Sequence, residues 1–145
     1  MTIRRTMLLD VNVLLALSWD QHVHHSVAHE RFAVLDEWST CSVTESGLVR
    51  LLLTPQVVGR TVSGAAALAH LAAMRHVSGW MFLDDPTSFA LPRIDMRVLM
   101  GRRQVTDLHL VNIAATHGEK LATFDASLRD SLVPADRDHV EIWSA

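Results

Sequence analysis

The chain has 145 residues, of which 49% are hydrophobic and 20% charged, with a formal net charge of -3. We expect one domain (residues 1–145) with a core that is stable without cross-links, and the composition excludes a disordered chain. The net charge gives no general attraction for nucleic acid, yet every basic residue except Lys120 is an arginine. Arginine binds phosphate bidentately, so this excess permits an RNA or DNA substrate without requiring one, although a GC-rich coding sequence would also produce it.

The N-terminus and the single cysteine indicate the compartment. Residues 1–9 combine basic and apolar residues, but Asp10 follows too early for a signal peptide. No uninterrupted stretch approaches the roughly 20 apolar residues that span a bilayer. Cys41 has no partner for an internal disulfide and is expected to be buried. We therefore expect a cytoplasmic protein with no membrane partner.

Apolar runs and helical spacing predict strands and helices in alternation along the chain. Thr44 and Ser63 are expected caps of two helices, and Gly118 is the expected C-terminal cap of another. Alternation of this kind favours an α/β fold with a mainly parallel sheet covered by helices on both faces. In chain order the expected elements are strand 6–9, helix 11–17, helix 26–38, a strand end at 40–43, helix 44–53, helix 63–74, strand 80–83, a weaker helix 94–100, helix 107–117, strand 121–124, short helix 126–132 and strand 140–143.

Four acids stand at the ends of these elements. Asp10 and Asp125 each close an apolar strand, whereas Glu45 and Asp107 lie in the first turn of a helix, each after a threonine. Both kinds of position open on the edge of the sheet formed by the carboxyl ends of parallel strands, so the four can converge. Taken singly, each acid has a simpler reading as a turn or helix-capping residue. Gathered together, they would need a hard cation, a shared proton or a basic partner.

Four motifs in order resemble those of PIN-domain ribonucleases and, more narrowly, VapC toxins of bacterial toxin-antitoxin pairs. They are LLDVNVLLAL (8–17), TESGLVRLL (44–52), VTDLHL (105–110) and LATFD (121–125). The resemblance implies a three-layer α/β/α PIN-like fold and an endoribonuclease dependent on Mg²⁺ or Mn²⁺. It also implies a cognate VapB-type antitoxin, an RNA substrate and a homodimer.

Carried over residue by residue, the resemblance makes Asp10, Glu45, Asp107 and Asp125 the metal-binding acids. Asn12 and Thr123 match the polar residues that support the site. The implied chemistry is in-line attack on an RNA phosphodiester by a water that the metal activates, leaving 5′-phosphate and 3′-hydroxyl ends.

Two positions depart from the family pattern. Ser127 stands where many relatives have a further acid, so a second metal would be held loosely or arrive only with substrate phosphate. His109 stands where a tyrosine is frequent, which leaves its role open.

A histidine-rich segment and the general chemistry of the site leave other functions open. The segment 22–29 contains four histidines, and His25 and His29 have a spacing that can bind zinc, although no Cys or acid completes such a site. A polar surface or a contact with RNA or a partner is the alternative for this segment. A PIN-fold binding protein with little or no catalysis is the alternative function. A phosphatase of small substrates is less favoured, because no G-x-x-x-x-G-K-[ST] loop occurs.

Overall fold

The structure, a computed structural model, describes residues 6–144; the basic start of the chain, 1–5, and Ala145 lie outside the described residues. Its centre is a sheet of five parallel strands in the order β3-β2-β1-β4-β5. The strands are β1 (Thr6–Leu9), β2 (Glu37–Cys41), β3 (Trp80–Leu83), β4 (Lys120–Thr123) and β5 (Val140–Ile142). Strand β1 therefore lies in the middle, between β2 and β4.

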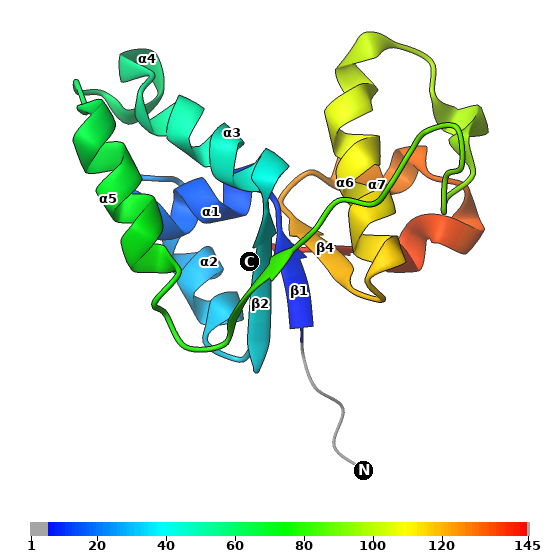
Figure 1. Ribbon diagram of the computed structural model, residues 1–145, viewed down its shortest axis with the longest axis horizontal. Coiled ribbons are helices and arrows are strands. Elements are labelled where there is room, and N and C mark those ends of the chain that lie inside the picture. Colours follow the sequence, from blue (N-terminus) through cyan, green and yellow to red (C-terminus); the bar gives the residue numbers. More distant parts are fainter. Residues whose placement is uncertain (1–5, 145) are drawn as a thin grey trace.

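Helices cover both faces of this sheet, which confirms the predicted three-layer α/β/α arrangement. Figure 1 shows α1 to α5 on one side of the strands and α6 and α7 on the other. The helices are α1 (Val11–Ser18), α2 (His25–Phe32), α3 (Ser42–Leu52), α4 (Pro55–Val58), α5 (Gly64–Met74), α6 (Val105–Thr116) and α7 (Ala126–Ser131). Three 3-10 turns, Met96–Val98, Arg102–Gln104 and Pro134–His139, complete the regular elements of the described residues.

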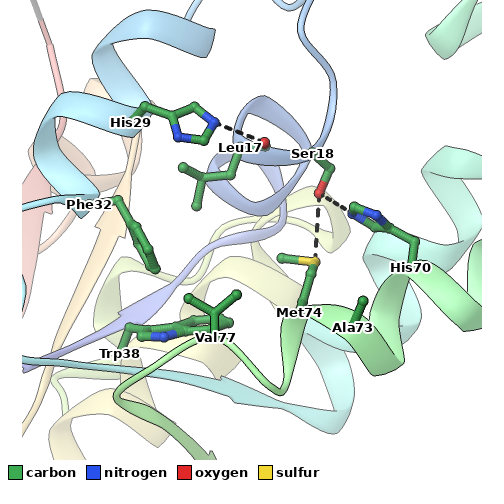
Figure 2. A pocket seen from close by; sticks show the side chains of 9 residues that line it. All are labelled: Leu17, Ser18, His29, Phe32, Trp38, His70, Ala73, Met74 and Val77. Atoms are coloured by element: carbon green, nitrogen blue, oxygen red, sulfur yellow. Dashed lines mark hydrogen bonds between the residues drawn. The ribbon is translucent and has the colours of Figure 1, made fainter.

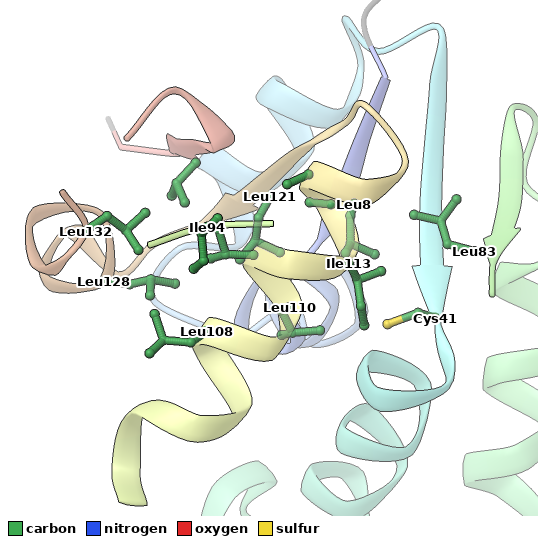
Figure 3. Close-up of a cluster of buried hydrophobic side chains, with 14 residues drawn as sticks. Leu8, Cys41, Leu83, Ile94, Leu108, Leu110, Ile113, Leu121, Leu128 and Leu132 are labelled. Carbon is green, nitrogen blue, oxygen red and sulfur yellow. The ribbon is translucent and has the colours of Figure 1, made fainter. Parts of the chain in front are cut away.

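The central strand is buried on both faces, as its continuous apolar sequence requires. Leu8 points into the cluster under α6 and α7, which Figure 3 shows together with Leu121, Ile113 and Leu128. The neighbours of Leu8 in β1, Met7 and Leu9, belong to a second cluster, on the face that α1 and α3 cover. Because successive side chains of a strand point to opposite faces, the three apolar residues of β1 contribute to both cores.

The predicted helix 26–38 is too long. Helix α2 ends at Phe32, and the chain turns into β2, which begins at Glu37. Trp38 therefore lies in a strand, almost fully buried, where its Nε1 donates to Ser78 O at 3.2 Å. Gly79 follows at φ +87, and a Cβ there would lie 2.6 Å from Asp36 O. The close approach of these two segments places Trp38 in the sheet instead of on a helix.

Two other expectations need correction. The predicted helix 94–100 is only the 3-10 turn Met96–Val98, because Asn112 Oδ1 accepts from the amides of Arg93 and Ile94 at 2.8 and 3.3 Å. Helix α3 begins at Ser42, so Thr44 lies inside its first turn, where its hydroxyl oxygen accepts from Cys41 N at 3.0 Å.

The other expected caps and the buried cysteine are confirmed. Ser63 Oγ accepts from Ala66 N at 3.1 Å at the start of α5, and Gly118 has the positive φ of +69 after α6. Cys41 is fully buried. Within residues 6–144 no helix has both the length and the apolar character that crossing a bilayer requires.

Candidate functional site

Three of the four predicted acids lie close together at the carboxyl edge of the sheet. Asp10 and Asp125 directly follow the adjacent strands β1 and β4, and Asp10 N donates to Ala122 O at 2.9 Å. Asp107 lies in the first turn of α6. Burial, and after it the negative charges of Asp10 and Asp125, raises the pKa of Asp107 from 3.8 to about 6. Asp107 lines one hollow with Asp10 and another with Asp125, and like charges held this close favour the protonated form of a carboxyl group.

Asp10 is the most buried of these acids, at 6% exposed. Burial raises its pKa, and the charge of Asp125 adds to the rise, while hydrogen bonds from Thr123 and the Val11 amide act in the opposite direction. Its Oδ2 accepts from Thr123 Oγ1 and its Oδ1 from Val11 N, both at 2.7 Å. These two bonds hold the side chain in one orientation at the start of α1.

Thr123 connects the strands, helix α1 and two of the acids. Its buried hydroxyl donates to Asp10 and accepts from Asn12 Nδ2 and from the Asp125 amide, both at 3.2 Å. Asn12 Oδ1 is buried and has no hydrogen-bond partner among the described residues. A buried acceptor without a partner is rare in a folded protein, so this oxygen suits a bound water or the hydration shell of a cation.

A structural role alone explains two of these aspartates but not the third. Asp10 caps α1, and Asp125 caps α7 through its Oδ1, which accepts from the amides of Ser127 and Leu128 at 3.0 and 3.3 Å. Asp107 does not cap its helix, and its carboxylate accepts no hydrogen bond within residues 6–144. A half-buried carboxyl group that is left unpaired beside two others costs stability, which is typical of functional sites.

Glu45 does not join this group in the structure. Its Oε2 accepts from Thr40 Oγ1 at 2.6 Å and lies 3.9 Å from Arg75 Nε. The residue lines a hollow between α3 and α5, whereas Asp10 and Asp107 line a neighbouring hollow; Ser46 lines both. The structure therefore places the predicted fourth acid beside the three aspartates without bringing it among them.

Two arginines that sequence reasoning did not single out lie at the aspartates. Arg50 lines the hollow of about 380 Å³ that contains Asp10 and Asp107, and Arg103 lines one of about 390 Å³ with Asp107 and Asp125. No motif marks them, because they come from the last turn of α3 and from the 3-10 turn before α6. Cations at the rim of an acidic group are suited to bind the phosphates of a substrate.

The donors of this site fit a hard divalent cation in kind. They are carboxylate and amide oxygens, which Mg²⁺ and Mn²⁺ prefer, and no sulfur or imidazole is among them. As placed here, however, no group of three or more His, Cys, Asp or Glu side chains within residues 6–144 is arranged to hold one ion.

The histidines have other partners. His25 Nδ1 and His29 Nε2 each lie within hydrogen-bond distance of a carbonyl oxygen near the end of α1, at 2.7 Å from Ala16 and 3.1 Å from Leu17. These two histidines, whose spacing could also bind zinc, thus connect α2 to the end of α1. His109 Nε2 lies 2.7 Å from Asp85 Oδ2, so its ring is directed to the loop after β3.

A separate apolar pocket of about 360 Å³ lies between α1, α2 and α5 (Figure 2). Phe32, Trp38 and Met74 line it, and Ser18 Oγ lies 2.8 Å from His70 Nε2 at its rim. None of the four acids lines this pocket.

Comparison with known proteins places the chain in a family. Residues 7–131 match the model of the PIN domain. Ribonuclease VapC38 of Mycobacterium tuberculosis is 44% identical over 83% of this chain and 86% of its own length. Ribonuclease VapC39 of the same species is 41% identical over 87% of this chain and 93% of its length. The chain belongs to the PIN domain family and, within it, to the VapC group.

Two solved structures have the same fold. The Mycobacterium tuberculosis toxin VapC20, described as cleaving the sarcin-ricin loop, aligns with a TM-score of 0.60 at 18% identity and covers 88% of this chain and 96% of its own. A chain of the Rickettsia felis VapBC2 structure, solved with a DNA fragment from their promoter, aligns with a TM-score of 0.65 at 11% identity and covers 96% and 99%. At these identities the likeness concerns the fold alone.

Proposed function

We propose that this protein is a divalent-cation-dependent endoribonuclease that acts as the toxin of a toxin-antitoxin pair. The observation that carries the proposal is the cluster of Asp10, Asp107 and Asp125, in which burial and then the charges of the other two acids raise the pKa of Asp107 to about 6. The ribonuclease names of its relatives support the same activity. The matched residues 7–131 also support one PIN-like domain over 1–145.

The proposed site uses all four predicted acids. Asp10, Asp107, Asp125 and Glu45 would hold Mg²⁺ or Mn²⁺, with Asn12 and Thr123 as supporting residues. When bound, the cation would supply an activated water and would neutralise charge on the attacking and leaving oxygens of the phosphodiester. Thr123 fixes the orientation of Asp10, and the Asn12 oxygen is available to accept from an ordered water.

Arginines at the rim support RNA as the substrate. Arg50 and Arg103 lie at the hollows of the aspartates, where they would bind phosphates on either side of the scissile bond. The alternative is a PIN-fold protein that binds RNA or a partner with little or no catalysis. The observation that favours this alternative is that Glu45 lines a different hollow from the three aspartates and lies 3.9 Å from Arg75 Nε.

Metal removal tests the proposed activity. Antitoxin-free protein is incubated with total RNA and with structured tRNA in Mg²⁺, in Mn²⁺ or in EDTA, and the product ends are mapped. We expect cleavage only with the cations, with 5′-phosphate and 3′-hydroxyl ends. Cleavage that persists in EDTA, or 2′,3′-cyclic phosphate ends, would contradict the mechanism; binding of RNA without any cleavage would favour the alternative.

An antitoxin is the expected partner, and the apolar pocket of Figure 2 is its proposed seat. The pocket presents exposed apolar surface to solvent, and a related fold occurs in the VapBC2 structure. A homodimer is proposed as well, supported by the exposed Leu68, Met81 and Phe82 around α5 and β3. A cytoplasmic location stays a prediction of the sequence.

Ala73→Arg tests the seat of the antitoxin. Ala73 lies on the exposed side of α5 and lines the pocket, so an arginine there would fill the apolar hollow with a charge. We expect the affinity for the cognate antitoxin to fall by about tenfold or more, since hot-spot contacts contribute at least ~2 kcal/mol. Calorimetry of the complex measures it. Ala72→Arg, on the same helix but outside the pocket, should bind normally; equal binding by both variants would place the antitoxin elsewhere.

A further inference from the structure

A small network of three residues surrounds the carboxylate of Glu45, two of which contact it directly. Its Oε2 accepts from Thr40 Oγ1 at 2.6 Å, and Thr40 Oγ1 in turn accepts from Trp80 Nε1 at 2.9 Å. Arg75 lies on the other side, with its Nε 3.9 Å from the same oxygen. The network joins the end of β2, the start of β3, the C-terminus of α5 and the first turn of α3.

The direction of these hydrogen bonds is fixed by chemistry. The indole Nε1 of Trp80 is a donor only, so the Thr40 hydroxyl must accept there. The single proton of Thr40 is then available for Glu45, and Thr40 is only 2% exposed, so bulk water does not compete for it. The bond from Thr40 to Glu45 is therefore short, shielded and oriented by a third group.

Arg75 lies beside Glu45 but does not form a hydrogen bond with it. Its Cζ lies 4.0 Å from the centre of the Trp80 ring and 5.3 Å from that of Phe82. Stacking on two rings fixes the guanidinium, and at 3.9 Å its Nε is too far from Glu45 for a hydrogen bond. Glu45 Oε1 accepts no hydrogen bond from any described residue. One carboxylate oxygen is thus held while the other is free.

We propose that Thr40, oriented by Trp80, is the positioning residue that keeps Glu45 available to the aspartate site. Without the Thr40 hydroxyl, the Glu45 carboxylate is free to form a bidentate pair with Arg75, a geometry that arginine favours and that would take it away from a cation. Partners that orient a metal ligand in this way affect metal affinity strongly. The inference rests on the proposed function in one respect, namely that Glu45 contributes to cation binding.

Mn²⁺ titration of the metal-free, antitoxin-free protein, with free Mn²⁺ followed by electron paramagnetic resonance, tests this role. We expect Thr40→Val to weaken Mn²⁺ binding by about tenfold or more, as is usual when a ligand loses its orienting partner. Thr40→Ser keeps the hydroxyl and should bind nearly as the wild type does. Equal affinity of Thr40→Val and the wild type, or equal loss in Thr40→Ser and Thr40→Val, would overturn the proposal.

Ser39→Ala is the matched control. Ser39 is the preceding buried residue of β2, and its hydroxyl donates at 2.6 Å to Glu119, which directly precedes β4. We expect its Mn²⁺ affinity to match that of the wild type. If Thr40→Val does not fold, as judged by circular dichroism, Trp80→Phe replaces it: it removes the donor that orients the hydroxyl and should weaken Mn²⁺ binding to a smaller degree, and an unchanged affinity would again overturn the role.

The outcome for the wild type separates this inference from the proposed function. Wild-type protein that binds Mn²⁺ through Asp10, together with a Thr40→Val variant of unchanged affinity, would defeat the positioning role alone. Wild-type protein that binds no Mn²⁺ would defeat both.

Discussion

Asp10→Asn is expected to lower RNA cleavage by about a hundredfold to a thousandfold at saturating Mg²⁺, because loss of a single group that stabilises developing charge commonly costs 10²–10³. Asp10 is nearly buried, and both its oxygens are fixed, by Thr123 and by the Val11 amide. An amide in its place removes the charge that would hold the cation without changing the size of the side chain. Single-turnover cleavage under saturating metal measures the loss.

Asp10→Asn is not expected to unfold the protein, because the residue can still cap α1. Asparagine caps a helix about as well as aspartate, so α1 should still begin at Val11. Asp138→Asn, on an exposed surface, is the control and should cleave normally. Full activity in Asp10→Asn, with an unchanged melting temperature, would mean that Asp10 is only a helix cap.

Asp107→Asn is expected to stabilise the metal-free protein and to destabilise it relative to wild type once Mg²⁺ is present. The pKa of Asp107 is raised to about 6, so folding favours its protonated form. The stabilising contribution of this group is complete below about pH 4 and is lost as the pH rises through about 6. At pH 7.5 the ionised carboxyl therefore lowers the free energy of unfolding by about 1–2 kcal/mol, after discounting for its partial exposure.

The neutral amide does not carry that penalty. In EDTA at pH 7.5, urea unfolding should show Asp107→Asn as the more stable protein, with a difference that shrinks between pH 6 and pH 4. Mg²⁺ at a hundred times its Kd should stabilise the wild type by about 2.7 kcal/mol and the variant by less, which inverts the order. Lower stability of Asp107→Asn under both conditions would instead indicate a structural role.

The fold was largely predictable because its signals are local. Strand β1 is predicted by its apolar run. Helix α6 is predicted by apolar residues at helical spacing and by Gly118, which follows its C-terminus. The failure at β2 has a physical cause: Val27, Leu35 and Trp38 are compatible with one helical face, and no glycine or proline marks the turn between α2 and β2. What places Trp38 in a strand is pairing with Met7 and Trp80, which are distant in sequence.

The candidate site was predictable to a similar degree. Residues at the ends of parallel strands must share one edge, so the nearness of Asp10 and Asp125 follows from the topology, and Asp107 follows from the start of α6. The side-chain direction of Glu45 does not follow from any such rule. It depends on the Thr40 hydroxyl, five residues earlier in a strand, and on the Trp80 indole, 35 residues later. No sequence spacing predicts those contacts.

The strand order also determines when, during synthesis, the acids can meet. Strand β1 occupies the centre of the sheet, but its partner β4 is made more than a hundred residues later. Asp10 and Asp125 can be neighbours only after β4 has left the ribosome and paired with β1. Such distant parallel pairing is slow compared with helix formation. A ribosome that carries a partly made chain therefore carries no assembled aspartate cluster, and a nuclease built on this topology would be harmless to its own translation until most of its sequence has emerged.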